Sequence, residues 1–137
     1  MAKPDEEKKS GGVDCMSTRV IICGGRDFSD KDLCFRTLDE ILPGCADVEI
    51  VSGHAKGEDS FDEEYAALRS FPVKIFKADW KQYGRAAGPI RNRAMLAYAL
   101  ELTPLIIAFW TGESKDTKNM IDQARKAGAE VKVISIN

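Results

Sequence analysis

The chain has 137 residues, which suits one domain, and 44% of them are hydrophobic, enough to build a core. The formal net charge of −2 argues against a molecule that attracts DNA or RNA over its whole surface. No apolar run approaches the roughly 18 residues of a membrane span, and the N-terminus lacks the apolar core of a secretory signal. We therefore expect a cytoplasmic protein that enters no membrane.

The composition divides the chain into an N-terminal extension, residues 1–17, and one domain, residues 18–137. Residues 1–15 are charged and contain almost nothing apolar, so we expect them to be disordered. The four cysteines form no CxxC pair, and a single histidine, His54, gives no zinc-ligand spacing. We therefore expect neither a metal nor a cofactor.

From Arg19 onward, short apolar runs alternate with segments of helical periodicity. The apolar runs predict strands at residues 20–23, 48–51, 73–76, 105–109 and 131–136. The periodic segments predict helices at residues 30–42, 58–70, 89–102 and 117–127. Residues 79–84 between them are expected to form a long loop that carries aromatic side chains. Ser29 or Asp30 is the expected N-cap of the first helix, and Asp116 or Thr117 that of the last.

Strict alternation of strands and helices predicts a Rossmann-like three-layer α/β sandwich with a parallel sheet and right-handed crossovers. The first and fourth strands are apolar on both faces and should be central. The expected strand order is therefore 3-2-1-4-5. Ligands of such sheets bind beyond the carboxyl ends of the strands, where the winding direction reverses.

Two glycine-containing segments follow strands and should meet at that edge. Residues 24–28, GGRDF, combine glycines that allow close backbone approach with Arg26, which suits a phosphate or carboxylate. Asp27 fits either a ribose hydroxyl or a partner for Arg26. Residues 52–59, SGHAKGED, lead into a helix whose N-terminus favours an anion, and Lys56 adds a cation. Each segment also fits a plain turn or connector.

Two further segments open the third and fourth helices. Arg91 and Arg93 would lie in a first helical turn, where cations are unfavourable unless an anion or an acidic residue neutralises them. Trp80 or Tyr83 fits stacking on a base or simple anchoring of the loop. In residues 110–117, WTGESKDT, the hydroxyl and backbone groups suit a phosphate. Glu113 and Asp116 suit a general base or a ribose ligand, or a capped loop.

These segments together give a set of candidate site residues. The tentative catalytic candidates are Arg91, Arg93 and Glu113. The ligand- or phosphate-binding candidates are Gly24, Gly25, Arg26, Asp27, Ser52, Gly53, His54, Lys56, Gly57, Asp59, Trp80, Arg91, Asn92, Gly112, Ser114 and Thr117.

Residues 24–28, 52–59, 78–95 and 108–121 resemble, in order and spacing, the YspA-like branch of the SLOG superfamily. This superfamily also includes Lonely-guy phosphoribohydrolases and the DNA-processing protein DprA. The resemblance covers residues 19–136 and implies a Rossmann-like domain that binds nucleotides or nucleotide-derived signals. It also implies a homodimer.

The resemblance leaves catalysis open. Lonely-guy enzymes cut the base–ribose bond with a helix arginine, which Arg91 or Arg93 could match, and a glutamate in a PGGxGTxxE loop. Met120 stands where that glutamate would align on Thr117. YspA-like proteins often carry WDGxSKGT, from which Thr111 and Asp116 depart, and His54 replaces a usual glycine.

Three functions follow from these observations. The first is a sensor or sequestering module for a nucleotide or an ADP-ribose- or NAD-like molecule. It is favoured because several loops and helix starts suit a phosphate, whereas few residues suit catalysis. The second is a nucleotide N-glycosidase. The third, by analogy with DprA, is binding of single-stranded DNA, against which the acidic balance of charges counts. We therefore expect a small-molecule partner rather than a nucleic acid.

Overall fold

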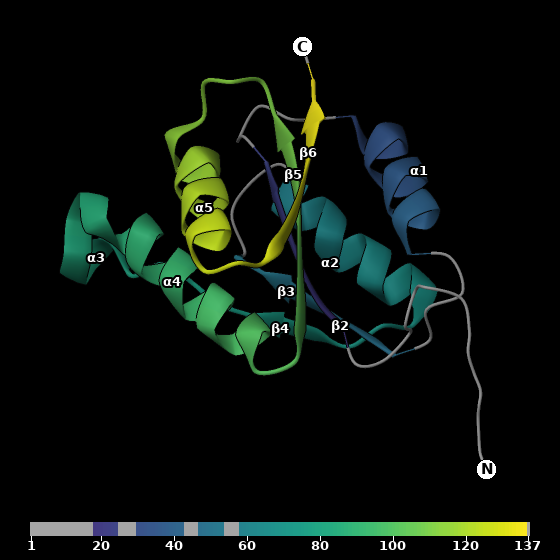
Figure 1. Ribbon diagram of the computed structural model, residues 1–137, viewed down its shortest axis with the longest axis horizontal. Helices are drawn as coiled ribbons and strands as arrows, with labels where there is room; N and C mark the ends of the chain where they lie inside the picture. Colours follow the sequence, from purple (N-terminus) through teal and green to yellow (C-terminus); the bar gives the residue numbers. More distant parts are fainter. Residues whose placement is uncertain (1–17, 25–29, 43–46, 54–57, 137) are drawn as a thin grey trace.

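A computed structural model describes residues 18–24, 30–42, 47–53 and 58–136, and it shows an α/β domain (Figure 1). The strands are β2 (Thr18–Gly24), β3 (Val48–Ser52), β4 (Val73–Ile75), β5 (Thr103–Trp110) and β6 (Glu130–Ser135). The helices are α1 (Lys31–Ile41), α2 (Glu58–Arg69), α3 (Trp80–Tyr83), the 3-10 turn η1 (Gly84–Ala86), α4 (Ala87–Leu100) and α5 (Lys115–Lys126).

All five strands are parallel and lie in the order β4-β3-β2-β5-β6. This is the predicted order 3-2-1-4-5, which is confirmed. The chain winds outward from β2 to β4 and then crosses back to β5, so the winding reverses between β2 and β5. Gly24 and Phe109 are register partners at the carboxyl end of this central pair.

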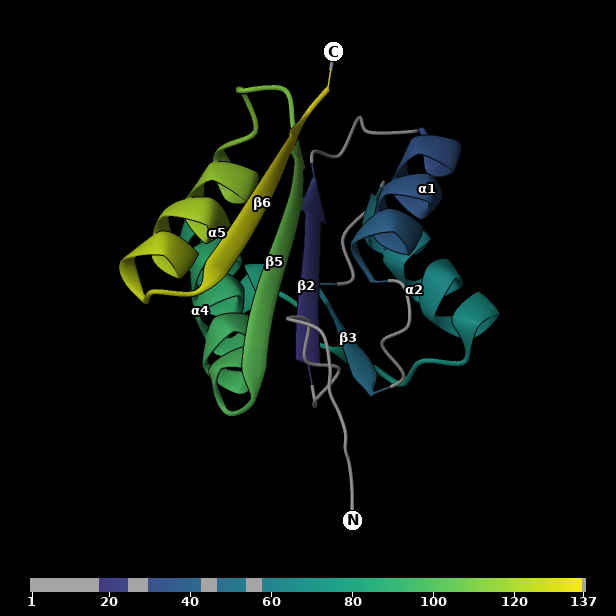
Figure 2. The ribbon, with the colours of Figure 1, turned by 45° about the vertical axis from the view of Figure 1, so that its right-hand side comes forward.

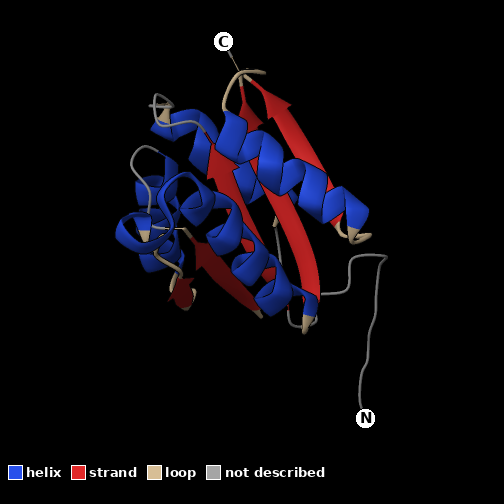
Figure 3. Cartoon of the chain, turned by 90° about the vertical axis from the view of Figure 1, so that its left-hand side faces the viewer, coloured by secondary structure: helices blue, strands red, loops and turns tan. Residues whose placement is uncertain are grey.

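Helices cover both faces of the sheet, with α1 and α2 on one side and α4 and α5 on the other (Figure 2). Successive residues of a strand point to opposite faces, so Val20 and Ile22 pack toward α1 and α2 while Ile21 packs toward α4 and α5. Figure 3 views the molecule from the α4 and α5 side, where these helices lie across the strands. The result is the expected three-layer sandwich.

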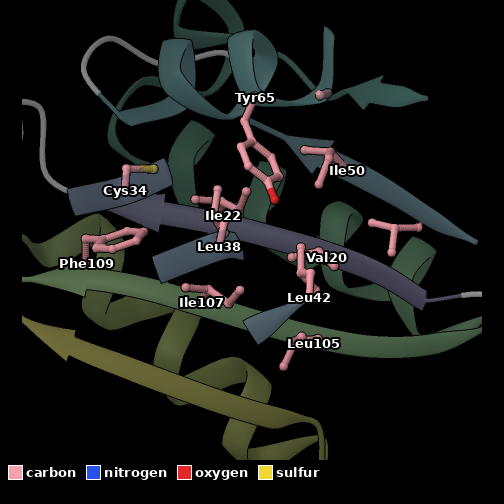
Figure 4. Packing of buried hydrophobic residues seen from close by; sticks show 12 residues of the cluster. Val20, Ile22, Cys34, Leu38, Leu42, Ile50, Tyr65, Leu105, Ile107 and Phe109 are labelled. Atoms are coloured by element: carbon pink, nitrogen blue, oxygen red, sulfur yellow. The ribbon is translucent and has the colours of Figure 1, made fainter. Parts of the chain in front are cut away.

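The hydrophobic cluster under α1 and α2 includes the phenol of Tyr65 (Figure 4). The Tyr65 ring is 2% exposed and meets the edge of the Phe35 ring with 5.4 Å between centroids. Its hydroxyl donates to Asp39 Oδ1 at 2.8 Å, which satisfies the one polar atom of the ring. Burial is the main reason that the pKa of Tyr65 is raised to about 12.

The amino edge of the sheet is held by a polar cluster centred on Arg19. Its guanidinium lies 3.6 Å from the ring centroid of Tyr98 and donates to Glu49 at 2.9 Å and to Glu101 at 3.0 Å. The Tyr98 hydroxyl donates to the same Glu49 carboxylate. These contacts tie β2, β3 and α4 together at the end of the sheet opposite the predicted site.

Three local expectations are corrected. The predicted loop at residues 79–84 contains the short helix α3, because the Asp79 side chain caps it by accepting from the Gln82 backbone N–H at 3.1 Å. Helix α4 begins at Ala87, two residues before Pro89. Helix α5 begins at Lys115 with Ser114 as its N-cap, so the expected cap at Asp116 or Thr117 is wrong.

Other boundaries agree with expectation. Asp30 caps α1 by accepting from the Leu33 backbone N–H at 3.0 Å. Gly128, with a φ of 81°, follows α5 in a left-handed conformation that ends the helix. Within the described residues, no helix is both long enough and apolar enough to cross a membrane.

Candidate functional site

Arg91 lies at the meeting point of three segments that are far apart in the sequence. Its side chain is 5% exposed, and all three guanidinium nitrogens donate hydrogen bonds. Nη1 donates to the Gly53 carbonyl at 3.3 Å, and Nη2 donates to Asp116 Oδ2 at 2.5 Å. Nε and Nη2 share Asn92 Oδ1, at 3.3 and 3.2 Å. The guanidinium therefore joins the end of β3 to α4 and to the start of α5.

Asn92 holds the start of α5 against α4. Its Nδ2 donates to Asp116 Oδ1 at 3.1 Å, to the Asp116 carbonyl at 3.2 Å and to Asn119 Oδ1 at 3.2 Å. Asn92 itself is 3% exposed. Buried amides are costly unless they are hydrogen-bonded, so these bonds fix both Asn92 and the Asp116 carboxylate.

Two glycines allow the close approach of these groups. A Cβ on Gly53 would lie 3.1 Å from Arg91 Nη1, and a Cβ on Gly88 would lie 2.7 Å from Asp116 Oδ1. The same point beside Gly88 is 3.4 Å from the Trp80 ring atom Cη2. A side chain at either position would push the charged pair apart. The residue type at positions 53 and 88 is therefore set by the charged pair.

The loop between β5 and α5 presents a capped helix start at the same edge. Ser114 Oγ accepts from the Thr117 backbone N–H at 3.3 Å, and the Trp110 indole donates to the Ser114 carbonyl at 3.1 Å. Gly112 adopts a φ of 100°, which L side chains rarely adopt. The Thr117 hydroxyl is buried and has no hydrogen-bond partner among the described residues.

Comparison with known proteins places this chain in a family. The model of the YspA, cpYpsA-related SLOG family matches residues 18–83. The Gene 61 protein of Mycobacterium phage D29 is 30% identical over 119 residues, which are 82% of this chain and 93% of that protein. This chain belongs to the SLOG family. As a SLOG domain, it is expected to have structural relatives of the same fold.

The DNA processing protein A (DprA) of Streptococcus pneumoniae is one such relative. Its X-ray structure matches with a TM-score of 0.67 and 17% sequence identity, over 90% of this chain and 52% of that one. This SLOG chain thus spans about half the length of DprA. At that identity the match demonstrates the shared fold.

The SLOG chain brings several predicted site residues together. Gly53, Arg91 and Asn92 meet in the buried cluster, while Ser114 and Thr117 begin the helix beside it. Gly24 and Ser52 end β2 and β3 at the same edge, and the Ser52 hydroxyl donates to Glu63 Oε2 at 3.1 Å.

Two catalytic candidates lie outside this cluster. Arg93 is exposed, two residues beyond Arg91 on α4, and therefore points away from the buried face on which Arg91 lies. Glu113 is exposed, and its backbone N–H donates to Thr111 Oγ1 at 3.3 Å. Because α4 begins at Ala87, the two arginines lie in its second turn, and an acidic residue neutralises Arg91.

Six candidates lie outside the described residues: Gly25, Arg26, Asp27, His54, Lys56 and Gly57. Asp59 belongs to helix α2, but its side chain is outside the description. Their assignments remain predictions. In the described parts of the chain, no group of three or more His, Cys, Asp or Glu side chains could hold a metal ion.

The structure adds Asp116 to the predicted site. Its carboxylate is 46% exposed, although Arg91 and Asn92 hold both of its oxygens. The sequence pointed to Asp116 as a general base, a ribose ligand or a helix cap near the expected pocket, but gave no reason to choose it over Glu113. The signal that could have found it was its departure from the glycine that is usual at this position in YspA-like proteins.

Met120 lies in the core of the SLOG domain. It is 1% exposed and packs with Met95 and Ala124 on the α4 and α5 side of the sheet. This is the position where the resemblance would place the glutamate of Lonely-guy enzymes. An apolar side chain here cannot supply an acid or a base.

Two further polar residues, Cys34 of α1 and Asp62 of α2, are fully buried. Both are 0% exposed. Burial, and then the carboxylates of Asp62 and Asp30, raise the pKa of the Cys34 thiol to about 12. The thiol therefore stays protonated at neutral pH and is not poised as a nucleophile.

Proposed function

We propose that this SLOG domain binds a nucleotide or a nucleotide-derived small molecule, such as an ADP-ribose- or NAD-like compound, at the carboxyl edge of its sheet. It acts there as a sensor or as a sequestering module. The proposal rests on one observation: the segments that follow β3 and β5 and the start of α4 converge on Arg91.

The position of this convergence supports a ligand site. It lies on the α4 and α5 side of the edge where the winding reverses, which is where ligands of open α/β sheets bind. The N-termini of α4 and α5 both lie there, and the positive ends of their dipoles favour anionic groups such as phosphate.

The same cluster favours binding over cleavage of the ligand. A glycosidase needs a positioned acid or base, and Met120 stands in the core where the related hydrolases have a glutamate. Arg91 already donates to a carbonyl and a carboxylate, so its charge is neutralised within the protein. Retention of an intact ligand is the outcome that these contacts favour.

The test incubates the purified protein with nucleoside monophosphates, NAD, ADP-ribose and cyclic nucleotides, followed by separation and mass spectrometry of both fractions. We expect an intact compound to be retained on the protein. Free base with ribose phosphate in solution would instead establish a nucleotide N-glycosidase. Lack of binding below about millimolar concentration would overturn the proposal, since weaker contacts are not useful recognition.

A second candidate function is binding of single-stranded DNA. It is favoured by helix α3 and the following turn, where Trp80 is 54% exposed and Tyr83 is 44% exposed beside the exposed cations Lys81 and Arg85. Aromatic side chains interleaved with cations are typical of single-strand binding. Retention on a single-stranded DNA column that weakens steeply with salt would support this function, and flow-through at low salt would exclude it.

A further inference from the structure

A carboxylate and an indole meet beside Gly88, a buried residue in the first turn of α4. Asp116 Oδ1 and Trp80 Cη2 lie 2.7 and 3.4 Å from the point where a Cβ on Gly88 would stand. They come from different elements, α5 and α3, and both are about half exposed, at 46% and 54%. Gly88 supplies no side chain between them. An acceptor of hydrogen bonds and an aromatic side chain, each about half exposed, therefore lie beside each other.

The Asp116 carboxylate is held in a fixed position by two donors. Arg91 donates to one of its oxygens and Asn92 to the other, and both of these partners are buried. A carboxylate oxygen has lone pairs beyond the one that each donor uses, so the exposed side of Asp116 can still accept hydrogen bonds. It accepts from hydroxyl groups, and its negative charge opposes a phosphate at this point.

We propose that Asp116 accepts hydrogen bonds from the ribose hydroxyls of the ligand while Trp80 stacks on its base. This inference rests on the proposed function and assigns a nucleoside moiety to the exposed surface formed by Asp116 and Trp80. It also assigns Arg91 to a positioning role, since its donors hold Asp116 and the Gly53 carbonyl. The phosphate then lies away from this pair.

The experiment compares ribose with deoxyribose forms of one ligand. The affinities of AMP, GMP, CMP and UMP, and of their 2′-deoxy and 3′-deoxy forms, are measured by calorimetry with the full chain. We expect at least one ribonucleotide to bind about tenfold more tightly than one of its deoxy forms, because hydrogen bonds to charged groups are strong.

The Asp116→Asn variant should remove most of this preference, so that the ratio of ribose to deoxyribose affinity falls toward one. The side-chain oxygen of the Asp116→Asn variant can still accept hydrogen bonds. The Asp116→Gly variant, which has no side-chain acceptor, therefore provides a second test. Asp122→Asn is the matched control, because Asp122 is also an aspartate of α5 but pairs with Lys118 and is 58% exposed. Loss of stability alone lowers both affinities and leaves their ratio unchanged.

Trp80 is tested separately. The Trp80→Ala variant should lower the affinities of ribose and deoxyribose forms alike, by about tenfold, since base stacking does not depend on the sugar. The Trp80→Phe variant should recover most of the affinity because it retains an aromatic face.

Each outcome separates the two proposals. A nucleotide that binds with no preference for ribose overturns the role of Asp116 but leaves nucleotide binding intact. A preference for ribose that survives both Asp116 substitutions also overturns the role of Asp116 and leaves nucleotide binding intact. Binding that is unaffected in Trp80→Ala overturns the stacking. Absence of binding by every ribonucleotide tested overturns this inference, and the ligand pool described above then decides the proposed function independently.

Discussion

A buried guanidinium is stable only when its donors are satisfied, and Arg91 has acceptors on every side. The Gly53 carbonyl, the Asn92 amide and the Asp116 carboxylate receive its hydrogen bonds. The geometry is that of a planar fork with several fixed donors, which an ammonium group does not reproduce. The identity of residue 91 therefore matters for stability as well as for the site.

Replacement of Arg91 by lysine is expected to lower the free energy of unfolding by about 1–3 kcal/mol. The ammonium keeps the positive charge but leaves at least one buried acceptor without a donor. Urea unfolding followed by circular dichroism measures the loss. Arg93→Lys on the exposed face of the same helix is the control, and it should change the free energy by less than about 0.5 kcal/mol. Equal effects of the two substitutions would contradict the buried role of Arg91.

The Gly88→Ala variant tests how firmly Asp116 is held. Glycine to alanine in a helix normally stabilises it by up to about 1 kcal/mol. Here the new Cβ would stand 2.7 Å from Asp116 Oδ1, which Asn92 holds in place. We therefore expect Gly88→Ala to lower the melting temperature. A raised melting temperature would mean that Asp116 moves aside freely.

The sequence identified Arg91 and Asn92 as site residues but could not show how they are arranged. The segment Ser114–Thr117 offers a serine, an aspartate and a threonine, each of which can cap a helix. Which of them leaves the helical conformation depends on tertiary contacts. Since Ser114 is the cap, Asp116 lies inside the first turn, where it meets Arg91.

Helix α5 carries much of the site, and its start depends on one side chain. The Ser114 hydroxyl accepts from the Thr117 backbone N–H and thereby fixes the turn that contains Asp116. Removal of this hydrogen bond leaves a helix N–H without a partner.

Ser114→Ala is expected to cost about 1 kcal/mol of stability, as for other N-caps, whereas Ser114→Gly should cost only a few tenths. Differential scanning calorimetry of the two variants measures the difference. If alanine and glycine prove equivalent to serine, the cap does not hold the helix start.

Elements with a strong apolar pattern could be predicted from the sequence, and those defined by local capping could not. The two apolar runs that became β2 and β5 are central, as expected. Helix α3 could not be predicted because a segment of four residues shows no helical periodicity. Its one sequence signal is Asp79, which caps it. The start of α4 was placed two residues late because proline is favoured at the first helical position, whereas Pro89 is the third residue of α4.

Two buried groups, the Cys34 thiol and the Tyr65 hydroxyl, make the stability of the whole molecule depend on pH. The pKa of Cys34 is raised from 9.0 to about 12 and that of Tyr65 from 10.0 to about 12, in both cases mainly by burial. A raised pKa in the folded state means that the fold favours the protonated form. The resulting stability is complete below the pKa of the unfolded chain and is lost as pH rises toward 12.

We therefore expect the free energy of unfolding to fall steadily above pH 9. Urea titrations at a series of pH values measure the slope. In the Cys34→Ala variant the number of protons released on unfolding near pH 10 should be smaller by about one. The change in slope is the readout, because the smaller side chain also lowers stability at every pH. An unchanged slope would show that the thiol ionises equally in both states.

At the scale of the molecule, the order of the strands followed from which runs were apolar on both faces. The separate assignment of α1 and α2 to one face and of α4 and α5 to the other follows from right-handed crossovers on either side of β2. The sequence left open whether an external anion or an acidic residue of the chain neutralises Arg91, since a pattern of apolar residues carries no information about polar pairs.

The Asp116 carboxylate also has a genetic consequence. One transition in the middle base converts an aspartate codon into a glycine codon, the residue usual at this position in YspA-like proteins. That single step would remove the carboxylate that accepts from Arg91 Nη2, while the Gly53 carbonyl and the Asn92 amide remain as acceptors for Arg91. The domain is thus one point mutation from a form whose buried cation is offered to an external anion.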